Sequence, residues 1–240
     1  MLFLLFVLLR SWADPLEAQE FPPKQLSEMG LFESIKRQDP KANLIPYTVN
    51  SPYWSDGTHK TRFILVPNKK KIIFSSHGNF EFPTETILIK NFYLDLVLNN
   101  PSSRTIIETR LFVKSSINDS WKGYSYQWNE EGSEAFLLTG SKTTTFVVET
   151  PADLSPGFFL QDYYFPSRND CLSCHTKAAG RVLGIRASQL NRRMDNNQNQ
   201  LELLEKAGIF SKQLPNDLDK LPLLPNPFDP KTSLERRARS

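Results

Sequence analysis

Residues 86–98 read TILIKNFYLDLVL, and residues 104–114 read RTIIETRLFVK. Both stretches are rich in β-branched and aromatic residues, which are typical of strands. Between them stands Asn99-Asn100-Pro101, a combination that favours a turn. The two stretches therefore predict two long strands joined by a turn.

Five further stretches of the same kind flank this pair. They are residues 61–67, 71–75, 123–128, 134–138 and 143–149, and turn-forming residues separate them. About seven strands at this spacing predict an antiparallel β-sandwich-like domain, which we place over residues 40–150. Nothing in the pattern indicates the alternation of strands and helices that a parallel sheet requires.

Residues 14–39 form a lead before this domain, and residues 25–36 (QLSEMGLFESIK) place apolar side chains close to helical spacing. We therefore predict one short helix in the lead. The class of fold is β plus a small α part.

Residues 151–240 predict a short helical cytochrome c-like segment with a proline-rich tail. Asn169 or Asp170 can cap a helix that carries the two cysteines of the chain. Residues 199–207 (NQLELLEKA) predict a second helix, and Gly208 suits its C-terminal end.

The composition is that of an ordinary globular protein. The chain has 240 residues, of which 39% are hydrophobic and 23% charged. The formal net charge of +3 is too small to indicate a nucleic-acid partner, so we expect none.

The first residues resemble a secretory signal. Residues 2–9 (LFLLFVLL) are apolar without interruption, and Ser11-Trp12-Ala13 fits the small-x-Ala pattern of a cleavage site. We predict a signal peptide over residues 1–13 and export to the periplasm, with no membrane span in the mature form. No basic residue precedes the apolar run, so an apolar strand or helix of a cytosolic protein stays open as an alternative.

The chemistry of the chain is concentrated in Cys171-Leu172-Ser173-Cys174-His175, a CxxCH motif. Two cysteines three apart on one helical turn can present their sulfurs to the two vinyl groups of a haem. The histidine that follows then becomes an axial ligand of the iron. The motif predicts one covalently attached haem c and a role in electron transfer rather than catalysis.

Three alternatives remain open at this stage. The two cysteines could form a thiol-disulfide pair, or they could bind zinc with His175 and either His59 or His77. The β domain could also be a ligand- or protein-binding module that uses the haem as a sensor.

The sixth ligand of the iron is not decided by the sequence. The candidates are Met194, His59, His77 and Met29, and an open position is the remaining possibility.

Several stretches resemble a family of exported bacterial proteins that comprises di-haem c-type cytochromes and conserved hypothetical proteins. The resemblance covers nearly all of the mature chain. It runs through residues 51–57 (SPYWSDG), 90–92 (KNF), 108–111 (ETRL), 121–129 (WKGYSYQWN), 166–176 (PSRNDCLSCHT), 183–184 (LG), 189–191 (QLN) and 199–201 (NQL).

The resemblance implies haem attachment at Cys171 and Cys174 and iron ligation by His175. It also implies that a stretch such as residues 234–239 leads into a second CxxCH cytochrome domain, whereas this sequence stops at Ser240. We therefore expect a truncated or split form, whose partner is a periplasmic redox protein or a second cytochrome domain or chain.

Overall fold

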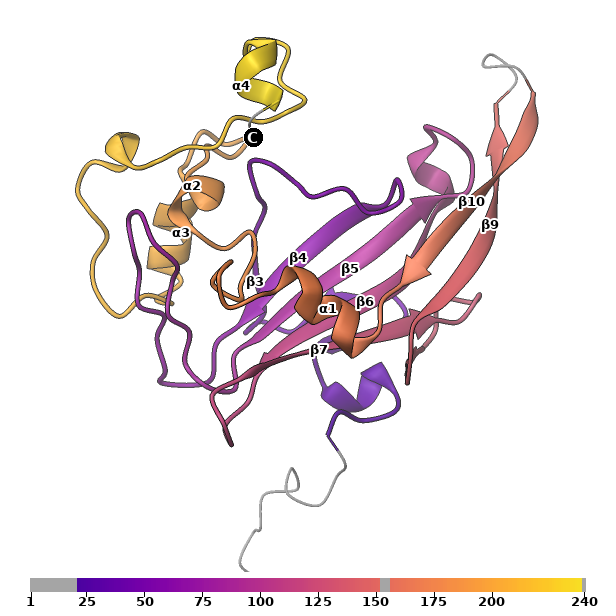
Figure 1. Cartoon of the computed structure of the whole chain (residues 1–240), viewed down its shortest axis with the longest axis horizontal. Helices are drawn as coiled ribbons and strands as arrows, with labels where there is room; N and C mark the ends of the chain where they lie inside the picture. Colours follow the sequence, from indigo (N-terminus) through magenta and orange to yellow (C-terminus); the bar gives the residue numbers. More distant parts are fainter. Residues whose placement is uncertain (1–20, 152–155, 239–240) are drawn as a thin grey trace, which may run out of the picture.

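The computed structural model describes residues 21–151 and 156–238, which are mostly β structure with a few short helices (Figure 1). The predicted β-rich fold with a small α part is confirmed at this level. Six strands form one antiparallel sheet, and their order in the sheet is their order in the chain. They are β3 (Ile45–Pro46), β4 (His59–Leu65), β5 (Ile87–Asp95), β6 (Arg104–Lys114), β7 (Trp121–Trp128) and β8 (Ala135–Leu137).

Two smaller sheets complete the β structure. β1 (Phe32–Ser34) pairs with β2 (Asp39–Pro40), and β9 (Lys142–Thr150) pairs with β10 (Gly157–Phe165) along its whole length. The β9–β10 ribbon packs on one end of the large sheet, so the second layer of the predicted sandwich is only two strands wide. The buried residues of this contact are Phe92, Leu94, Ile107, Val148, Tyr163 and Phe165.

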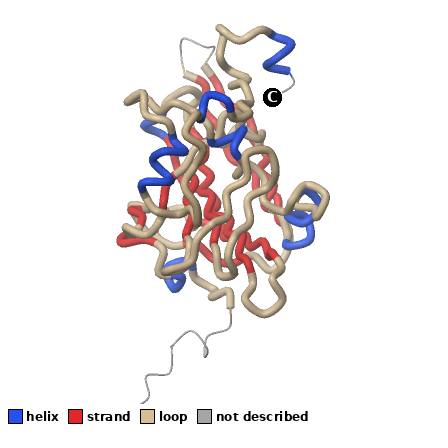
Figure 2. Tube along the Cα trace, turned by 90° about the vertical axis from the view of Figure 1, so that its left-hand side faces the viewer, coloured by secondary structure: helices blue, strands red, loops and turns tan. Residues whose placement is uncertain are grey.

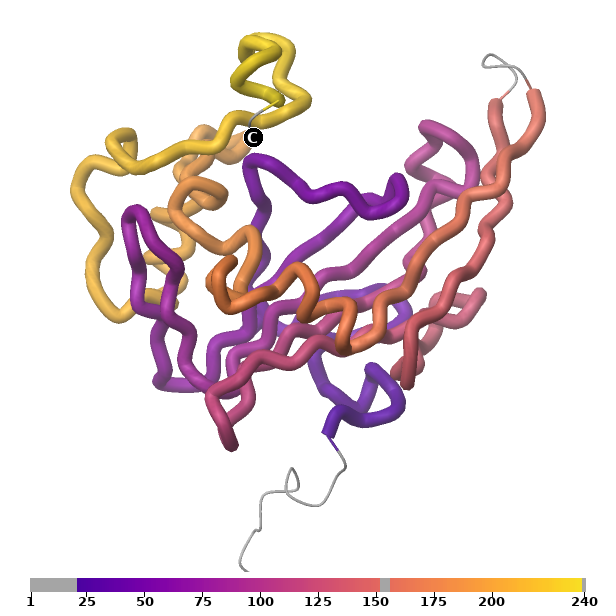
Figure 3. The backbone as a smooth tube through the Cα atoms, viewed as in Figure 1, coloured from indigo at the N-terminus to yellow at the C-terminus, as the bar shows by residue number. Residues whose placement is uncertain are grey.

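The two faces of the large sheet bury separate clusters because successive strand residues point to opposite sides. On one face, Leu88 and Phe112 pack with residues of α2 (Ala187–Leu190) and α3 (Gln200–Lys206). On the other face, Ile89 and Leu111 pack with the N-terminal residues from Leu26 onward. Figure 3 shows α2 and α3 at one end of the molecule and the β9–β10 ribbon at the other.

The predicted domain boundary at residue 150 does not separate two hydrophobic cores. Leu201 and Leu204 of α3 share a buried cluster with Ile64, Leu88 and Phe112 of the sheet. The residues that follow the boundary therefore belong to the same folded unit as the β domain.

The structure corrects one strand prediction and adds one strand that the sequence pattern did not predict. Residues 71–75 make only isolated bridges, between Ile72 and Phe210 and between Ile73 and Glu81. Residues 157–165 (GFFLQDYYF) lie within the predicted helical segment, but they form β10. Their aromatic side chains occupy both faces of the strand, so the alternation that marks a half-buried strand is missing.

The predicted helix over residues 25–36 is also corrected. The chain makes one turn of 3-10 helix, Leu26–Met29, and Gly30 then takes the left-handed conformation with φ 60°. This ends the helix, and β1 follows at once. The predicted signal peptide, residues 1–13, lies outside the described residues.

The C-terminal helix prediction is confirmed, because α3 is capped by the side chain of Asn199 and Gly208 follows it with φ 71°. The remaining helical turns are short: Pro101–Ser103, Leu218–Lys220 and α4 (Leu234–Ala238). In the side view of Figure 2 the helices lie at the edges of the molecule, while loops cover much of its surface. Within the described residues, no helix combines the length and apolar character that crossing a membrane requires.

A buried polar contact fixes β10 on the middle of the sheet. The Tyr163 hydroxyl donates to Oε2 of Glu108 at 2.5 Å, and Glu108 is fully buried on β6. Arg110 binds the same carboxylate with both Nε, at 2.9 Å, and Nη2, at 2.8 Å. A buried carboxylate is tolerated only when it is paired in this way.

We predict that Glu108→Gln lowers the free energy of unfolding by about 3 kcal/mol, because Arg110 then keeps a half-buried charge without its partner. Urea denaturation followed by circular dichroism measures the change. Glu131→Gln is the control, because Glu131 is exposed, and its effect should stay within about 0.5 kcal/mol. Equal effects of the two variants would contradict the structural role of the pair.

Candidate functional site

α1 (Arg168–Cys174) carries the CxxCH motif and lies on β7 (Figure 1). The N-cap is Ser167, not the predicted Asn169 or Asp170, which lie in the first turn. Ser167 Oγ accepts from the Asp170 amide, and Asp170 Oδ2 accepts from the Ser167 amide at 2.8 Å. The Tyr164 hydroxyl donates to the same oxygen at 2.7 Å, which ties the start of α1 to β10.

The two thiols of the motif have different surroundings, and both are free. The Cys171 side chain lies on Gly123 of β7, where an added Cβ would stand 2.7 Å from its Cβ and Sγ. Cys171 is therefore half-buried, whereas Cys174 is exposed. The lack of a side chain at Gly123 is what lets α1 approach the sheet so closely.

His175 follows α1 as its C-cap and packs on the sheet. Its ring centroid lies 4.2 Å from that of Phe112, and Phe112 in turn stacks on Trp121. His175 Nδ1 lies 2.5 Å from the carbonyl oxygen of Arg181. A carbonyl can only accept, so Nδ1 carries the proton and donates it, which leaves the lone pair on Nε2.

The surroundings keep the His175 imidazole neutral. Burial lowers its pKa to about 4, and the positive charges of Lys90 and Arg110 act in the same direction, against the bond to the Arg181 carbonyl. Only a neutral imidazole can ligate a metal, so His175 is in the form that iron ligation requires at neutral pH.

Basic side chains cross the same face of the sheet beside the motif. Arg62 of β4 lies opposite Lys90 of β5, and Lys90 lies opposite Arg110 of β6. Arg110 shares its face with Phe112, two residues further on, and Phe112 touches His175. Lys60 lies two positions before Arg62 and therefore on the same face. We call Lys60, Arg62, Lys90 and Arg110 the cationic row.

The members of the cationic row raise the cost of one another's charge. Burial is the main reason that the pKa of Lys90 falls to about 7, and the charges of Arg62, Arg110 and Lys60 add to it. Burial and the same two arginines lower the pKa of Lys60 to about 8. Lysine thus titrates near neutral pH in this part of the sheet.

The structure offers little support for the two alternatives without haem. Burial raises the pKa of the Cys171 thiol, whereas a reactive redox cysteine has a lowered pKa. Within residues 21–151 and 156–238, no group of three or more His, Cys, Asp and Glu residues is placed to hold a metal ion. His59 and His77 therefore do not complete a zinc site with the motif.

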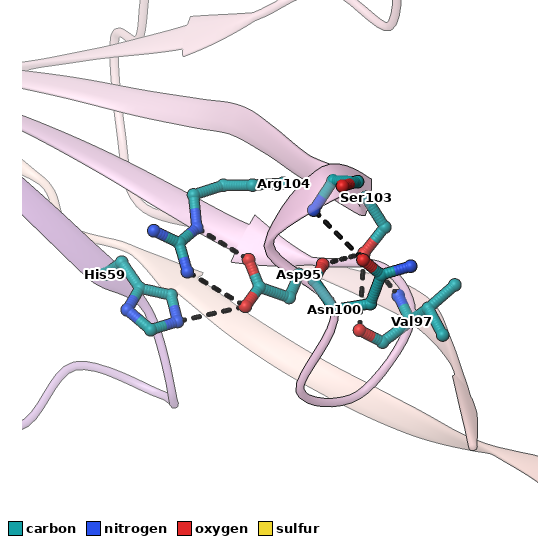
Figure 4. A network of polar contacts seen from close by, with 7 residues as sticks. His59, Asp95, Val97, Asn100, Ser103 and Arg104 are labelled. Atoms are coloured by element: carbon teal, nitrogen blue, oxygen red, sulfur yellow. Dashed lines mark hydrogen bonds and ion pairs between the residues drawn. The ribbon is translucent and has the colours of Figure 1, made fainter. Parts of the chain in front are cut away.

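Two of the four candidates for the sixth ligand lie away from His175. Met29 packs in the cluster of Ile89 and Leu111, on the opposite face of the sheet. His59 Nε2 lies 3.1 Å from Asp95, which also accepts two hydrogen bonds from Arg104 (Figure 4). The partner of His59 is thus a carboxylate at the far end of β5.

The other two candidates are placed differently. Met194 is half-buried, and its sulfur accepts from the Thr48 hydroxyl at 3.9 Å. His77 is exposed, in a loop whose Asn79 side chain fills the space beside Gly180. The loop of His77 therefore touches the segment that follows His175.

Comparisons of this chain with protein-family models, with curated proteins and with solved structures give no match.

Sequence reasoning found the motif but missed the cationic row. The available signal was a spacing of two within each strand, Lys60 with Arg62 and Glu108 with Arg110, which puts each pair on one face. Lys90 gives no such signal, because its place in the row depends on strand register.

We predict that Gly123→Ala destabilises the protein by about 1–3 kcal/mol, because the new methyl group overlaps Cys171 and α1 must move outward. Chemical denaturation measures the loss, and the rate of Cys171 modification by a thiol reagent should rise. Gly140→Ala is the matched control, because an added Cβ at Gly140 meets no atom within 4 Å. If both variants behave alike, Cys171 does not rest on Gly123.

The lowered pKa of Lys90 predicts a pH-dependent stability. Between the pKa of about 7 in the folded chain and 10.5 in the unfolded one, the unfolded chain binds more protons, so this group lets stability rise with pH. In ligand-free protein near pH 6, Lys90→Met should raise the free energy of unfolding by about 2 kcal/mol. This value is smaller than the full pKa shift implies, because Lys90 still touches water. Denaturation midpoints at about pH 6 and pH 9.5 should show the advantage of the variant shrinking, and a constant difference would contradict the prediction.

Proposed function

We propose that this protein is an exported c-type cytochrome-like electron-transfer protein with one haem attached to Cys171 and Cys174. The observation that carries the proposal is the neutral His175, whose Nδ1 is held on the Arg181 carbonyl directly after the two thiols. A hydrogen bond from the other ring nitrogen to a carbonyl oxygen fixes the tautomer and the orientation of a histidine that ligates a metal.

The residues of the site fit a haem, and each has a definable task. The haem would supply a one-electron Fe(II)/Fe(III) couple. Cys171 and Cys174 would hold it covalently, and His175 would offer its Nε2 lone pair to the iron. The Arg181 carbonyl keeps the imidazole in the tautomer that ligation needs, while Phe112 supports the ring from the sheet side.

The proposed compartment and partners follow from the sequence. The signal-like N-terminus and the haem motif both point to the periplasm, where a redox protein or a second cytochrome domain or chain would exchange electrons with this haem. We propose no nucleic-acid partner.

A haem-bearing sensor is the second candidate function. Met29 and His59 lie away from His175, so Met194 and His77 remain as the candidates for the sixth ligand of the iron. A haem that neither of them ligates has the open sixth position that a sensor uses. A six-coordinate spectrum that His77→Ala or Met194→Ala converts to five-coordinate supports electron transfer. A five-coordinate reduced haem that binds carbon monoxide without displacing a protein ligand supports the sensor.

We predict that the double variant Cys171→Ser with Cys174→Ser abolishes covalent haem, because both thioether bonds are lost. Protein is expressed with the periplasmic haem-attachment machinery, and the pyridine haemochrome spectrum is recorded after denaturation. Ser173→Ala, a change inside the same motif, should retain the c-type band. Haem that stays with the denatured double variant, or wild-type protein without the band, would contradict the proposed function.

A further inference from the structure

The cationic row is a costly arrangement for the protein alone. Arg62, Lys90 and Arg110 lie directly opposite one another across three neighbouring strands, on one face. Like charges in directly opposite positions destabilise a sheet. All three side chains are only half-exposed, so water screens this repulsion less than at an open surface.

The negative charge beside the row is already in use. Glu108 is bound by Arg110 through one hydrogen bond and one ion-pair contact, and by the Tyr163 hydroxyl through a second hydrogen bond. No carboxylate of the described residues makes a hydrogen bond or an ion pair with Arg62 or Lys90. The middle of the row therefore has positive charge that no carboxylate balances, on Arg62 and, below its pKa of about 7, on Lys90.

Lys60 and Arg110, at the two ends of the row, have partners of their own, and these partners do not balance the charge of Arg62 and Lys90. The Lys60 ammonium group donates to the Tyr53 carbonyl and stands 5.7 Å from the centre of the Phe92 ring. The Arg110 guanidinium lies 4.3 Å from the centre of the same ring. These partners orient the two cations. The charge of Arg110 is balanced by Glu108 and that of Lys60 is partly offset by Asp56, so the unmatched charge lies on Arg62 and Lys90.

We propose that Arg62 and Lys90, with Lys60 and Arg110 on either side, bind a carboxylate or similar oxyanion group beside α1. A guanidinium can bind both oxygens of such a group, and the neighbouring ammonium supplies a third donor. The titratable and charged groups around the site are Asp56 beside Lys60, Tyr47 and Arg192 beside Arg62, Glu108 and Tyr163 beside Arg110 and, on the side of α1, Cys171 and His175.

The oxyanion can come from two sources. One source is the pair of propionate groups of the haem, and this form of the inference rests on the proposed function. The other source is a free carboxylate or phosphate ligand, which requires no haem. Both satisfy the same unmatched charge, so the experiment must separate them.

The first arm uses the full chain produced without haem. Succinate and inorganic phosphate are titrated by calorimetry into the wild type, Lys90→Met and Arg62→Leu. Each variant should bind at least about tenfold more weakly, because it loses a charged donor. Lys122→Met, an exposed change on β7, is the control and should bind as the wild type does. Removal of an unmatched charge should not impair folding, which thermal melts verify.

The second arm uses the haem-loaded chain. If the propionates occupy the row, loaded protein no longer binds succinate or phosphate, and Lys90→Met shifts the propionate bending band in the resonance Raman spectrum. If the natural ligand is free, loaded protein binds the anions as before and the band is unchanged.

The two proposals can fail separately. Loss of succinate or phosphate binding in Lys90→Met supports the site even where the haemochrome test shows no covalent haem. The inference is overturned if haem-free wild type binds neither anion and Lys90→Met leaves the propionate band of loaded protein unchanged. It is also overturned if Lys122→Met weakens binding as much as Lys90→Met does.

Discussion

The buried contact of Glu108 with Arg110 and Tyr163 determines where the motif can lie. It holds β10 against the middle of β6, and β10 ends two residues before the cap of α1. The chain between them is fixed as well, because the Pro166 carbonyl accepts from the Ser125 hydroxyl of β7 at 2.9 Å. With strand and linker both anchored, α1 has one place to start. The placement of both thiols is thus a consequence of a polar contact in the core.

The motif and the cationic row form one electrostatic unit. The charges of Lys90 and Arg110 help burial to hold His175 neutral, which is the state a ligand for iron must have. The same charges repel one another across the sheet, which is a stability cost that a purely structural sheet would avoid. Arrangements that break a rule of stability without local compensation are expected at functional sites. In this protein the costly charges and the CxxCH motif lie on the same side of the sheet.

The sequence was most informative where one physical effect dominates. The strand over residues 104–114 was predicted with the bounds of β6, because β-branched residues and clear turns outweigh other signals there. The sequence did not predict β10, because aromatic residues lie on both of its faces. The predicted helix over residues 25–36 was too long, because Gly30 ends the helical turn. The CxxCH motif is contiguous in the sequence, so it could be recognised directly. The cationic row could not be predicted from the sequence, because its members come from three strands and only the strand register brings them together.

Register also explains why the row persists despite its repulsion. Side chains alternate between the faces, so a slip of β4 by one residue against β5 would turn Arg62 to the opposite face. That face is lined by Phe63, Ile89 and Leu111, which bury an apolar cluster. A guanidinium buried there without a partner would cost more than repulsion between half-exposed cations that still touch water. The apolar cluster on one face therefore keeps the positive charges aligned on the other, beside α1.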